Sequence, residues 1–466
     1  MACWDMEDGG MLVDENVRVR HLCDLETREA ILRSQVLSVA QVKAAVVDRV
    51  AVAEEEVAML ERARLAERDE RKAAGAKVGA FTHAKQLSKM RLRYRALASE
   101  AFNPGSPQQC KWLLYDVFAL PEQRKRRPDG TWGVSTDKNA IAALLRLKNN
   151  RKGKPISDEV RGVLGLLREI GHLEQLRTTF VVAAGRAPLE ADRKHRLMRT
   201  QIGLHRTATG RTASGADADE KAGESDTNGA NWPVAVRDMV VPSAGKMFVQ
   251  ADWSQVEWLL ALYFAEDWAS WDRAIAGEDA HRRVASVLYG VAYDAVTPEQ
   301  RTMAKKVRHA LTYGSGVPKI ANFTGLSIAM VEQVIAANRA AFPMVAAWQQ
   351  RTVDLAYRQR YLETPFGWRR WFLGPQADVP KILAFTSATA ADMMKVRMPG
   401  AAALARQYGG RLVTTTFDSM LCEVNGDQGT DAAAALKQHF ERSFVTLGGR
   451  SFPATVKVGP NWQAVS

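Results

Sequence analysis

Four side chains that suit nucleotide binding recur at every fourth position of one segment, which runs from residue 298 to residue 313. They are Arg301, Lys305, His309 and Tyr313. Because four residues advance about 400° around an α-helix, these side chains form one stripe on a helix surface. Two cations, an imidazole and a phenol suit a nucleoside triphosphate, since the cations can meet phosphates and the rings can meet base and sugar. An ordinary basic surface with the tyrosine in the core fits the same spacing, so the stripe alone leaves both interpretations open.

Three acidic residues lie at positions where a carboxylate either binds a metal or substrate or stabilises a turn or a helix end. Asp252 ends the apolar run KMFVQAD, which predicts a buried strand, and a strand terminus is a common place for a metal ligand. Asp418 lies in an Asp-Ser turn between TTTF and MLCEV, where a short side chain suffices as a turn former. Glu257 follows Ser254 by three residues, which is the spacing of a capping box. Each acid therefore has a structural interpretation beside the chemical one.

The elements that must position these residues are mixed helix and strand. Residues 14–98 lack proline and carry apolar residues at helical spacing, which predicts long packed helices. Ser106, with Pro107 after it and Gln109 at the third position, predicts the start of another helix. The small polar residues 213–231 predict a mobile loop. Helices at the front and strands behind predict an α+β fold.

Local signals also fix the elements around the stripe and around the turn. Thr297 and Gln300 form a capping box that starts the helix at residue 298. The run RLVTTTFDSMLCEV predicts two strands joined at Asp418, followed by a helix and by a last strand, ATVKVG.

Composition and charge narrow the class of protein. A chain of 466 residues allows roughly three domains at about 150 residues each. The 64 Lys and Arg residues exceed the 52 Asp and Glu residues, and the net charge of +12 favours a polyanionic partner. The four cysteines are widely spaced, which predicts neither a zinc site nor disulfides and suits a reducing cytoplasm. No long apolar stretch or signal peptide is visible, so we expect no membrane partner.

Nine segments, in order along the chain, resemble the polymerase region of family A DNA polymerases, the DNA polymerase I type. They are HRTATGR, NGANWP, VQADWSQVE, EDAHRRVASVLYG, RTMAKKVRHALTYG, ETPFGWRRW, TSATAADMMK, FDS and VGPNW. The resemblance implies a right-hand fold, with a helical thumb and helical fingers around an antiparallel palm sheet. The implied domains are a thumb and N-terminal helical region (1–182), a first palm part (183–278), fingers (279–373) and a second palm part (374–466). Residues 39–98 are more than the family's thumb helices need.

The resemblance also implies a role for each candidate residue. Asp252 and Asp418, with the main-chain carbonyl of Trp253, would hold two Mg²⁺ ions, for which Mn²⁺ is the expected substitute. The implied nucleotide-binding residues are His281, Arg301, Lys305, His309, Tyr313 and Glu257, the last of which would stand where a ribose 2′-hydroxyl must go. The implied primer-template contacts are Arg211, Asn231, Arg369, Ser387 and Phe417.

The function implied is a DNA-directed DNA polymerase that adds dNTPs to a primer 3′-hydroxyl in the cytoplasm of a bacterial or phage-infected cell. The chain starts where the polymerase region starts, so we expect no proofreading from this chain. Whether a separate exonuclease or a processivity factor is a partner stays open at this point. A single-subunit RNA polymerase is the nearest alternative, but a carboxylate at Glu257 would exclude ribose. A duplex-binding accessory protein without catalysis is the alternative from another class, and the presence of both aspartates argues against it.

Several residues depart from the family's usual pattern. His309 replaces Phe or Tyr, Arg308 stands where Asn is common, and Ser387 stands where Gln is usual. Phe417 and Ser419 flank the second aspartate in place of His and Glu. Serine is short and phenylalanine has no donor, so two hydrogen bonds to the primer terminus would be lost. We therefore expect low fidelity, ready extension of mismatches and a capacity for lesion bypass.

Overall fold

The computed structural model describes residues 2–74, 88–92, 102–127, 129–204, 207, 209–214, 232–312, 316–372 and 382–466. Two compact units result. The small unit is Leu22–Thr179, and the large unit combines Met1–His21 with Phe180–Ser466. Residues Met1–His21 belong to the large unit, because strand β1 (Met11–Asp14) pairs there with β4 and β7. The boundaries expected for thumb, palm and fingers stay predictions.

The small unit is mostly helical. Its elements are α2 (Glu15–Ser38, which begins in the large unit), α3 (Ala40–Ala73), α5 (Pro107–Lys111), the π-helix η1 (Trp112–Val117), the hairpin of β2 (Arg124–Arg126) and β3 (Trp132–Val134), α6 (Lys138–Leu144) and α7 (Asp158–Leu176). The long helices predicted for residues 14–98 are confirmed as far as Ala73, and Ser106 caps α5 through the N–H of Gln109 as predicted. The core of this unit includes the fully buried Leu113, Leu164 and neighbouring apolar residues.

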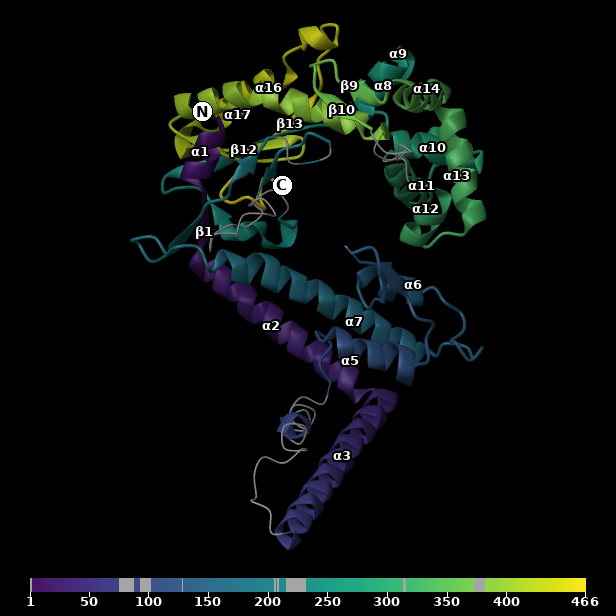
Figure 1. The fold of residues 1–466 in the computed structure, drawn as a ribbon. Helices are drawn as coiled ribbons and strands as arrows, with labels where there is room; N and C mark the ends of the chain where they lie inside the picture. Colours follow the sequence, from purple (N-terminus) through teal and green to yellow (C-terminus); the bar gives the residue numbers. More distant parts are fainter. Residues whose placement is uncertain are drawn as a thin grey trace. The chain divides into compact units, whose positions relative to one another are not determined.

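The palm sheet of the large unit has four antiparallel strands in the order β11-β12-β8-β13. They are β8 (Lys246–Trp253), β11 (Arg411–Thr416), β12 (Ser419–Asn425) and β13 (Ala454–Gly459). Helices α16 (Phe385–Gln407) and α17 (Gly429–Glu441) pack on this sheet (Figure 1). The predicted buried strand, the predicted hairpin and the predicted last strand are all confirmed.

A second sheet and a group of helices complete the large unit. The sheet has the order β4-β1-β7, from β1 (Met11–Asp14), β4 (His195–Met198) and β7 (Val240–Val241), and the pair β5 (Ile202–Gly203) and β6 (Ala213–Ser214) lies apart from it. The remaining elements are α1 (Ala2–Gly9), η2 (Arg177–Val182), η4 (Val234–Met239), α8 (Val256–Ala265), α9 (Trp268–Ile275), α10 (Ala280–Tyr289), η5 (Tyr293–Ala295), α11 (Pro298–Thr312), α12 (Val317–Thr324), α13 (Ile328–Ala341), α14 (Pro343–Gln359), β9 (Tyr361–Glu363), β10 (Arg369–Trp371), η6 (Gly426–Gln428) and η7 (Val445–Leu447). Helices α10, α11 and α13 pack on one another.

Helix α11 starts as its sequence predicts. The N–H of Thr297 donates to Gln300 Oε1 over 2.9 Å, and the N–H of Gln300 donates to Thr297 Oγ1 over 3.3 Å. Most of the loop predicted for residues 213–231 lies outside the described residues, which include only β6 from that range. In the part of the chain that the structure describes, no helix combines the length and the apolar character needed to cross a membrane.

Candidate active site

The two predicted metal-binding aspartates meet at one end of the palm sheet. Asp252 is the second-to-last residue of β8 and lies opposite Ser419, the first residue of β12. Asp418 precedes that strand by one residue, and its carbonyl accepts a hydrogen bond from the N–H of Trp253 over 3.2 Å. The antiparallel register of β8 and β12 therefore brings together carboxylates that lie far apart in the sequence.

The electrostatics of this carboxylate pair fit a bound cation. Burial raises the pKa of Asp418 to about 7, and the nearby charge of Asp252 adds to the rise. Burial also raises the pKa of Asp252, against the opposing effect of Lys457 and Arg237. Asp252 Oδ1 is buried and accepts no hydrogen bond from the described residues. Two half-buried acids that disfavour each other's charge, one with an unused oxygen, match the oxygen ligands that Mg²⁺ prefers.

No larger cluster of metal-binding side chains accompanies this pair. Among the described residues, no group of three or more His, Cys, Asp and Glu side chains is placed to hold a metal ion. Any further ligand from this part of the chain must therefore be of another kind, such as the main-chain carbonyl of Trp253 predicted from the sequence.

The capping box predicted at Ser254 is wrong. The residue before α8 is Gln255, in the left-handed conformation with φ 54°, and it makes no side-chain cap. Because Gln255 occupies the position before the helix, the hydroxyl of Ser254 is not next to the free N–H groups of the first turn; it lies 3.2 Å from Thr455 Oγ1. The Glu257 carboxylate instead forms an ion pair with Arg211 and accepts a hydrogen bond from Ser387 Oγ over 2.7 Å.

Four predicted site residues thus form one cluster, which we call the Glu257 cluster: Arg211, Glu257, Ser387 and Phe417. The Arg211 guanidinium lies 5.0 Å from the centre of the Phe417 ring. Phe417 has φ 54° and stands half exposed between β11 and β12, next to Asp418. The charges of Glu257 and Arg211 both act on the pKa of Asp418, so the cluster borders the carboxylate pair. Ser387, by contrast, is only 1% exposed.

The predicted triphosphate-binding residues converge at the start of α10 and along α11. Asp279 caps α10 by accepting hydrogen bonds from the N–H groups of His281 and Arg282, over 2.8 and 3.3 Å. The other oxygen of Asp279 pairs with Arg301 of α11. Burial lowers the pKa of His281 to about 4, and the charges of Arg308, Arg301 and Lys305 lower it further. His281 therefore faces the cationic side of α11. Tyr313 and the side chain of His309 lie outside the described residues.

Sequence reasoning missed two charged residues here. Arg308 is buried, with its guanidinium 3.9 Å from the centre of the Trp258 ring and 5.6 Å from that of Phe342, and burial lowers its pKa to about 10. Arg308 of α11 contacts Trp258 of α8, whereas from the sequence it was noted only as a departure from the family pattern. Asp279 was visible as a helix cap two residues before His281. Its ion pair with Arg301 follows from tertiary packing.

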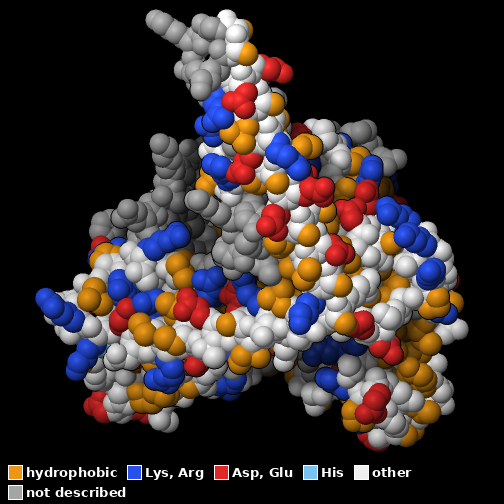
Figure 2. All heavy atoms as spheres, turned by 90° about the horizontal axis from the view of Figure 1, so that it is seen from below, with side chains coloured by type: hydrophobic (Ala, Val, Ile, Leu, Met, Phe, Trp, Pro, Cys, Tyr) orange, Lys and Arg blue, Asp and Glu red, His pale blue; other side chains and the backbone are white. Residues whose placement is uncertain are grey.

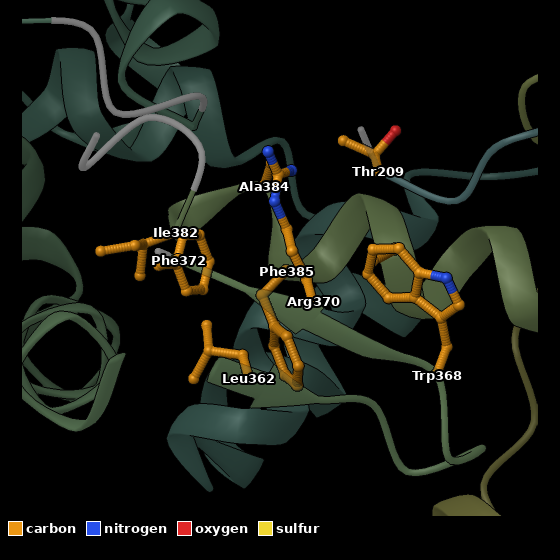
Figure 3. Close-up of a pocket in the computed structure, with 9 residues that line it drawn as sticks. Thr209, Leu362, Trp368, Arg370, Phe372, Ile382, Ala384 and Phe385 are labelled. Carbon is orange, nitrogen blue, oxygen red and sulfur yellow. The ribbon is translucent and has the colours of Figure 1, made fainter. Parts of the chain in front are cut away.

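The remaining predicted contacts lie apart from the Glu257 cluster or outside the described residues. Arg369 of β10 pairs with Glu363 and lies 4.6 Å from the Tyr361 ring centre. Asn231 lies outside the described residues. Beside β10 is a small open hollow, where Figure 3 shows Trp368 and Phe372 on either side of Arg370.

Gly210 belongs to the segment that carries Arg211, and it is packed against this hairpin. Its φ is 69°, and a Cβ there would come within 3.1 Å of the Trp368 ring. A glycine is therefore required at this close approach, which fixes the backbone just before Arg211.

Comparisons with known proteins identify the family of the chain. A family model described as DNA polymerase family A matches residues 80–464. DNA polymerase I of Deinococcus radiodurans is 26% identical over 394 residues, and the thermostable DNA polymerase I of Thermus thermophilus is 28% identical over 393 residues. Each alignment covers 81% of this chain but only 38% and 43% of the relatives. The chain thus spans less than half the length of these relatives.

A solved structure is also similar. It is the POL domain of Pol1 from M. smegmatis, in complex with DNA primer-template and dNTP. The TM-score is 0.69 at 21% identity, and the match covers 100% of this chain and 69% of that one. This similarity confirms the predicted α+β right-hand fold, with helical thumb and fingers around an antiparallel palm sheet.

Proposed function

The chain belongs to DNA polymerase family A, and from this premise we propose that it is a DNA-directed DNA polymerase that adds dNTPs to the 3′-hydroxyl of a primer. One observation carries the proposal: the half-buried pair of Asp252 and Asp418 at the end of β8 and β12, with a buried, unused oxygen on Asp252. Such a pair is what a phosphoryl transfer assisted by divalent metal ions needs.

Family A DNA polymerases use divalent metal ions. In this chain Asp252 and Asp418, with the carbonyl of Trp253, would hold two Mg²⁺ ions, or Mn²⁺ in their place. When bound, such ions activate the primer hydroxyl and neutralise charge on the triphosphate and on the leaving pyrophosphate. The role of the chain is to hold two carboxylates next to each other. Because their negative charges repel, a cation bound between them is stabilising.

The triphosphate is held, in this proposal, by Arg301, Lys305 and His281. Asp279 orients Arg301 through their ion pair, so the guanidinium is already in place before the nucleotide binds. His281 is neutral near pH 7, because its pKa is about 4. It therefore contributes a directed hydrogen bond without adding to the positive charge, which Arg301 and Lys305 already supply. His309 and Tyr313 stay predicted contacts to sugar and base.

Primer-template DNA is the second partner. Arg211 and the half-exposed ring of Phe417 border the carboxylate pair and are placed to meet the primer terminus. The basic strand β2, whose residues Arg124–Arg126 are all exposed, suits phosphate contacts in the small unit. Figure 2 shows Lys and Arg side chains in separate groups with Asp and Glu between them, which suits several local phosphate contacts better than one continuous basic surface.

Discrimination at the primer terminus stays a prediction. The ring of Phe417 has no donor, and the hydroxyl of Ser387 is buried and bonded to Glu257. Both observations support the expectation that mismatched termini are extended readily, with low fidelity and lesion bypass as its consequences. We place the reaction in the cytoplasm of a bacterial or phage-infected cell, where an exonuclease or a processivity factor would act as a separate partner.

Primer extension with Mg²⁺ tests the proposed function, with dNTPs compared against rNTPs. We expect extension with dNTPs, and a loss of about 1000-fold or more in Asp252→Asn and Asp418→Asn with duplex affinity unchanged. The matched control is Asp427→Asn, which makes the same change on an exposed residue just after the other end of β12. Near-normal extension by either active-site variant would refute the assignment of the carboxylate pair.

A further inference from the structure

The Glu257 carboxylate is held by two donors that come from different parts of the large unit. Arg211, which precedes β6, pairs with Oε1. Ser387, near the start of α16, donates its hydroxyl to the same oxygen over 2.7 Å. Glu257 itself projects from the first turn of α8, so three segments meet at one carboxylate oxygen.

Ser387 is placed to act inside the protein and not on DNA. It is 1% exposed, and α16 packs there against α8 and β12. A serine hydroxyl can donate one hydrogen bond, and Glu257 Oε1 accepts it. The short side chain of serine fits this buried position.

The two donors differ in how well they can hold the carboxylate during a reaction cycle. Arg211 lies over the half-exposed ring of Phe417 and is a predicted contact of the primer-template. When DNA contacts the Arg211 guanidinium, we expect the ion pair between Arg211 and Glu257 to weaken. Ser387 is buried, so its hydrogen bond persists with DNA present. A glutamate has three side-chain torsions, and without a fixed donor it samples several rotamers.

We propose that Ser387 is a positioning residue for Glu257, and that it keeps the carboxylate in the place where a ribose 2′-hydroxyl would have to enter. The inference rests on the proposed polymerase function and specifies its sugar selection. A rigid carboxylate rejects the extra hydroxyl by steric conflict, whereas a mobile one can turn aside and admit it. Selection of the sugar is thereby set by a residue that never touches the nucleotide.

Single-nucleotide insertion by the whole chain tests this inference, with kcat/KM measured for a dNTP and for the matching rNTP. We expect Ser387→Ala to raise relative rNTP use about five- to tenfold, because one of two hydrogen bonds to a charged group is lost. Ser387→Thr keeps the hydroxyl and should retain most of the discrimination. Thr389→Val is the matched control, since it removes another buried hydroxyl of α16, one that donates to the carbonyl of Phe385 over 3.1 Å.

A double-mutant cycle separates positioning from general damage. In the background of Glu257→Ala, Ser387→Ala should leave the sugar preference unchanged, since the carboxylate that it positions is gone. An equal effect in both backgrounds, or an equal loss for both sugars, would overturn the inference. The inference would also be overturned if the wild type inserts dNTPs and Ser387→Ala has the same ratio of rNTP to dNTP insertion as the wild type. A wild type that inserts neither nucleotide would refute the proposed function instead.

Discussion

Replacing Asp418 by asparagine should stabilise the metal-free protein at neutral pH, although it should abolish extension. The carboxyl of Asp418 is half-buried next to Asp252, and its pKa is raised to about 7. An unfolded chain gives an aspartate its ordinary pKa of about 3.9. The folded protein therefore holds this proton over a pH range in which the unfolded chain has lost it. The stabilising contribution of the neutral carboxyl is complete below about pH 4 and is lost as the pH rises towards 7.

The size of the effect follows from the two pKa values. Between about pH 5 and about pH 7, the wild type loses free energy of unfolding at about 1.4 kcal/mol per pH unit from this residue, which makes about 3 kcal/mol. Asparagine has nearly the same shape as a neutral aspartic acid and does not ionise. Relative to wild type, Asp418→Asn should thus gain about 2 to 3 kcal/mol across this interval.

Urea unfolding of both proteins in EDTA, at a series of pH values, measures this difference, since all other titrating groups are shared. Asp252→Asn is an informative companion, because removal of the neighbouring charge should lower the pKa of Asp418 and flatten the pH dependence. Added Mg²⁺ should stabilise wild type more as the pH rises, because ligands must lose their protons, and should have less effect on Asp418→Asn. A difference between Asp418→Asn and wild type that stays constant with pH would refute the reasoning.

Three further predictions concern the neighbouring residues. Asp279→Asn should leave Arg301 without its ion pair and raise the KM for dNTPs about fivefold, with DNA affinity as the unchanged control in a binding titration. Phe417→Ala should weaken the binding of primer-template about two- to fivefold by removing the ring under Arg211, and an unchanged Kd would show that this ring does not orient the guanidinium. Glu257→Ala should increase ribonucleotide insertion well beyond Glu257→Gln, which keeps the bulk; equal discrimination in both would show that the side chain does not face the sugar.

The parts of the fold that sequence predicted correctly are those set by neighbours in the chain. The start of α11 depends on Thr297 and Gln300, which exchange hydrogen bonds three residues apart. The hairpin around Asp418 depends on two apolar runs and a tight turn. In such cases the interaction partners are visible in one short window, so the pattern and the structure agree.

The errors and omissions arise where a distant partner competes with a local one. Ser254 and Glu257 have the spacing of a capping box, but Arg211 and Ser387 offer the carboxylate stronger partners. Arg308 would ordinarily lie in solvent, and its burial follows from the rings of Trp258 and Phe342, which tertiary packing brings close to it. Family resemblance supplied the candidate site residues, but the sequence could not say which of them contact one another.

The central place of β8 in the palm sheet determines when the protein can become active during synthesis. Both neighbours of β8 come from near the C-terminus, β12 at Ser419–Asn425 and β13 at Ala454–Gly459. The small unit is formed by Leu22–Thr179 alone, so it can fold early on the ribosome. Strand β8, by contrast, is synthesised before both of its neighbours, and its two edges stay unpaired until the segment from α8 to α16 and then β12 and β13 have been translated. A chain interrupted in this interval exposes an apolar strand to other chains and lacks Asp418. We therefore expect incomplete products to be prone to aggregation and to lack the pair of carboxylates that Asp252 and Asp418 form.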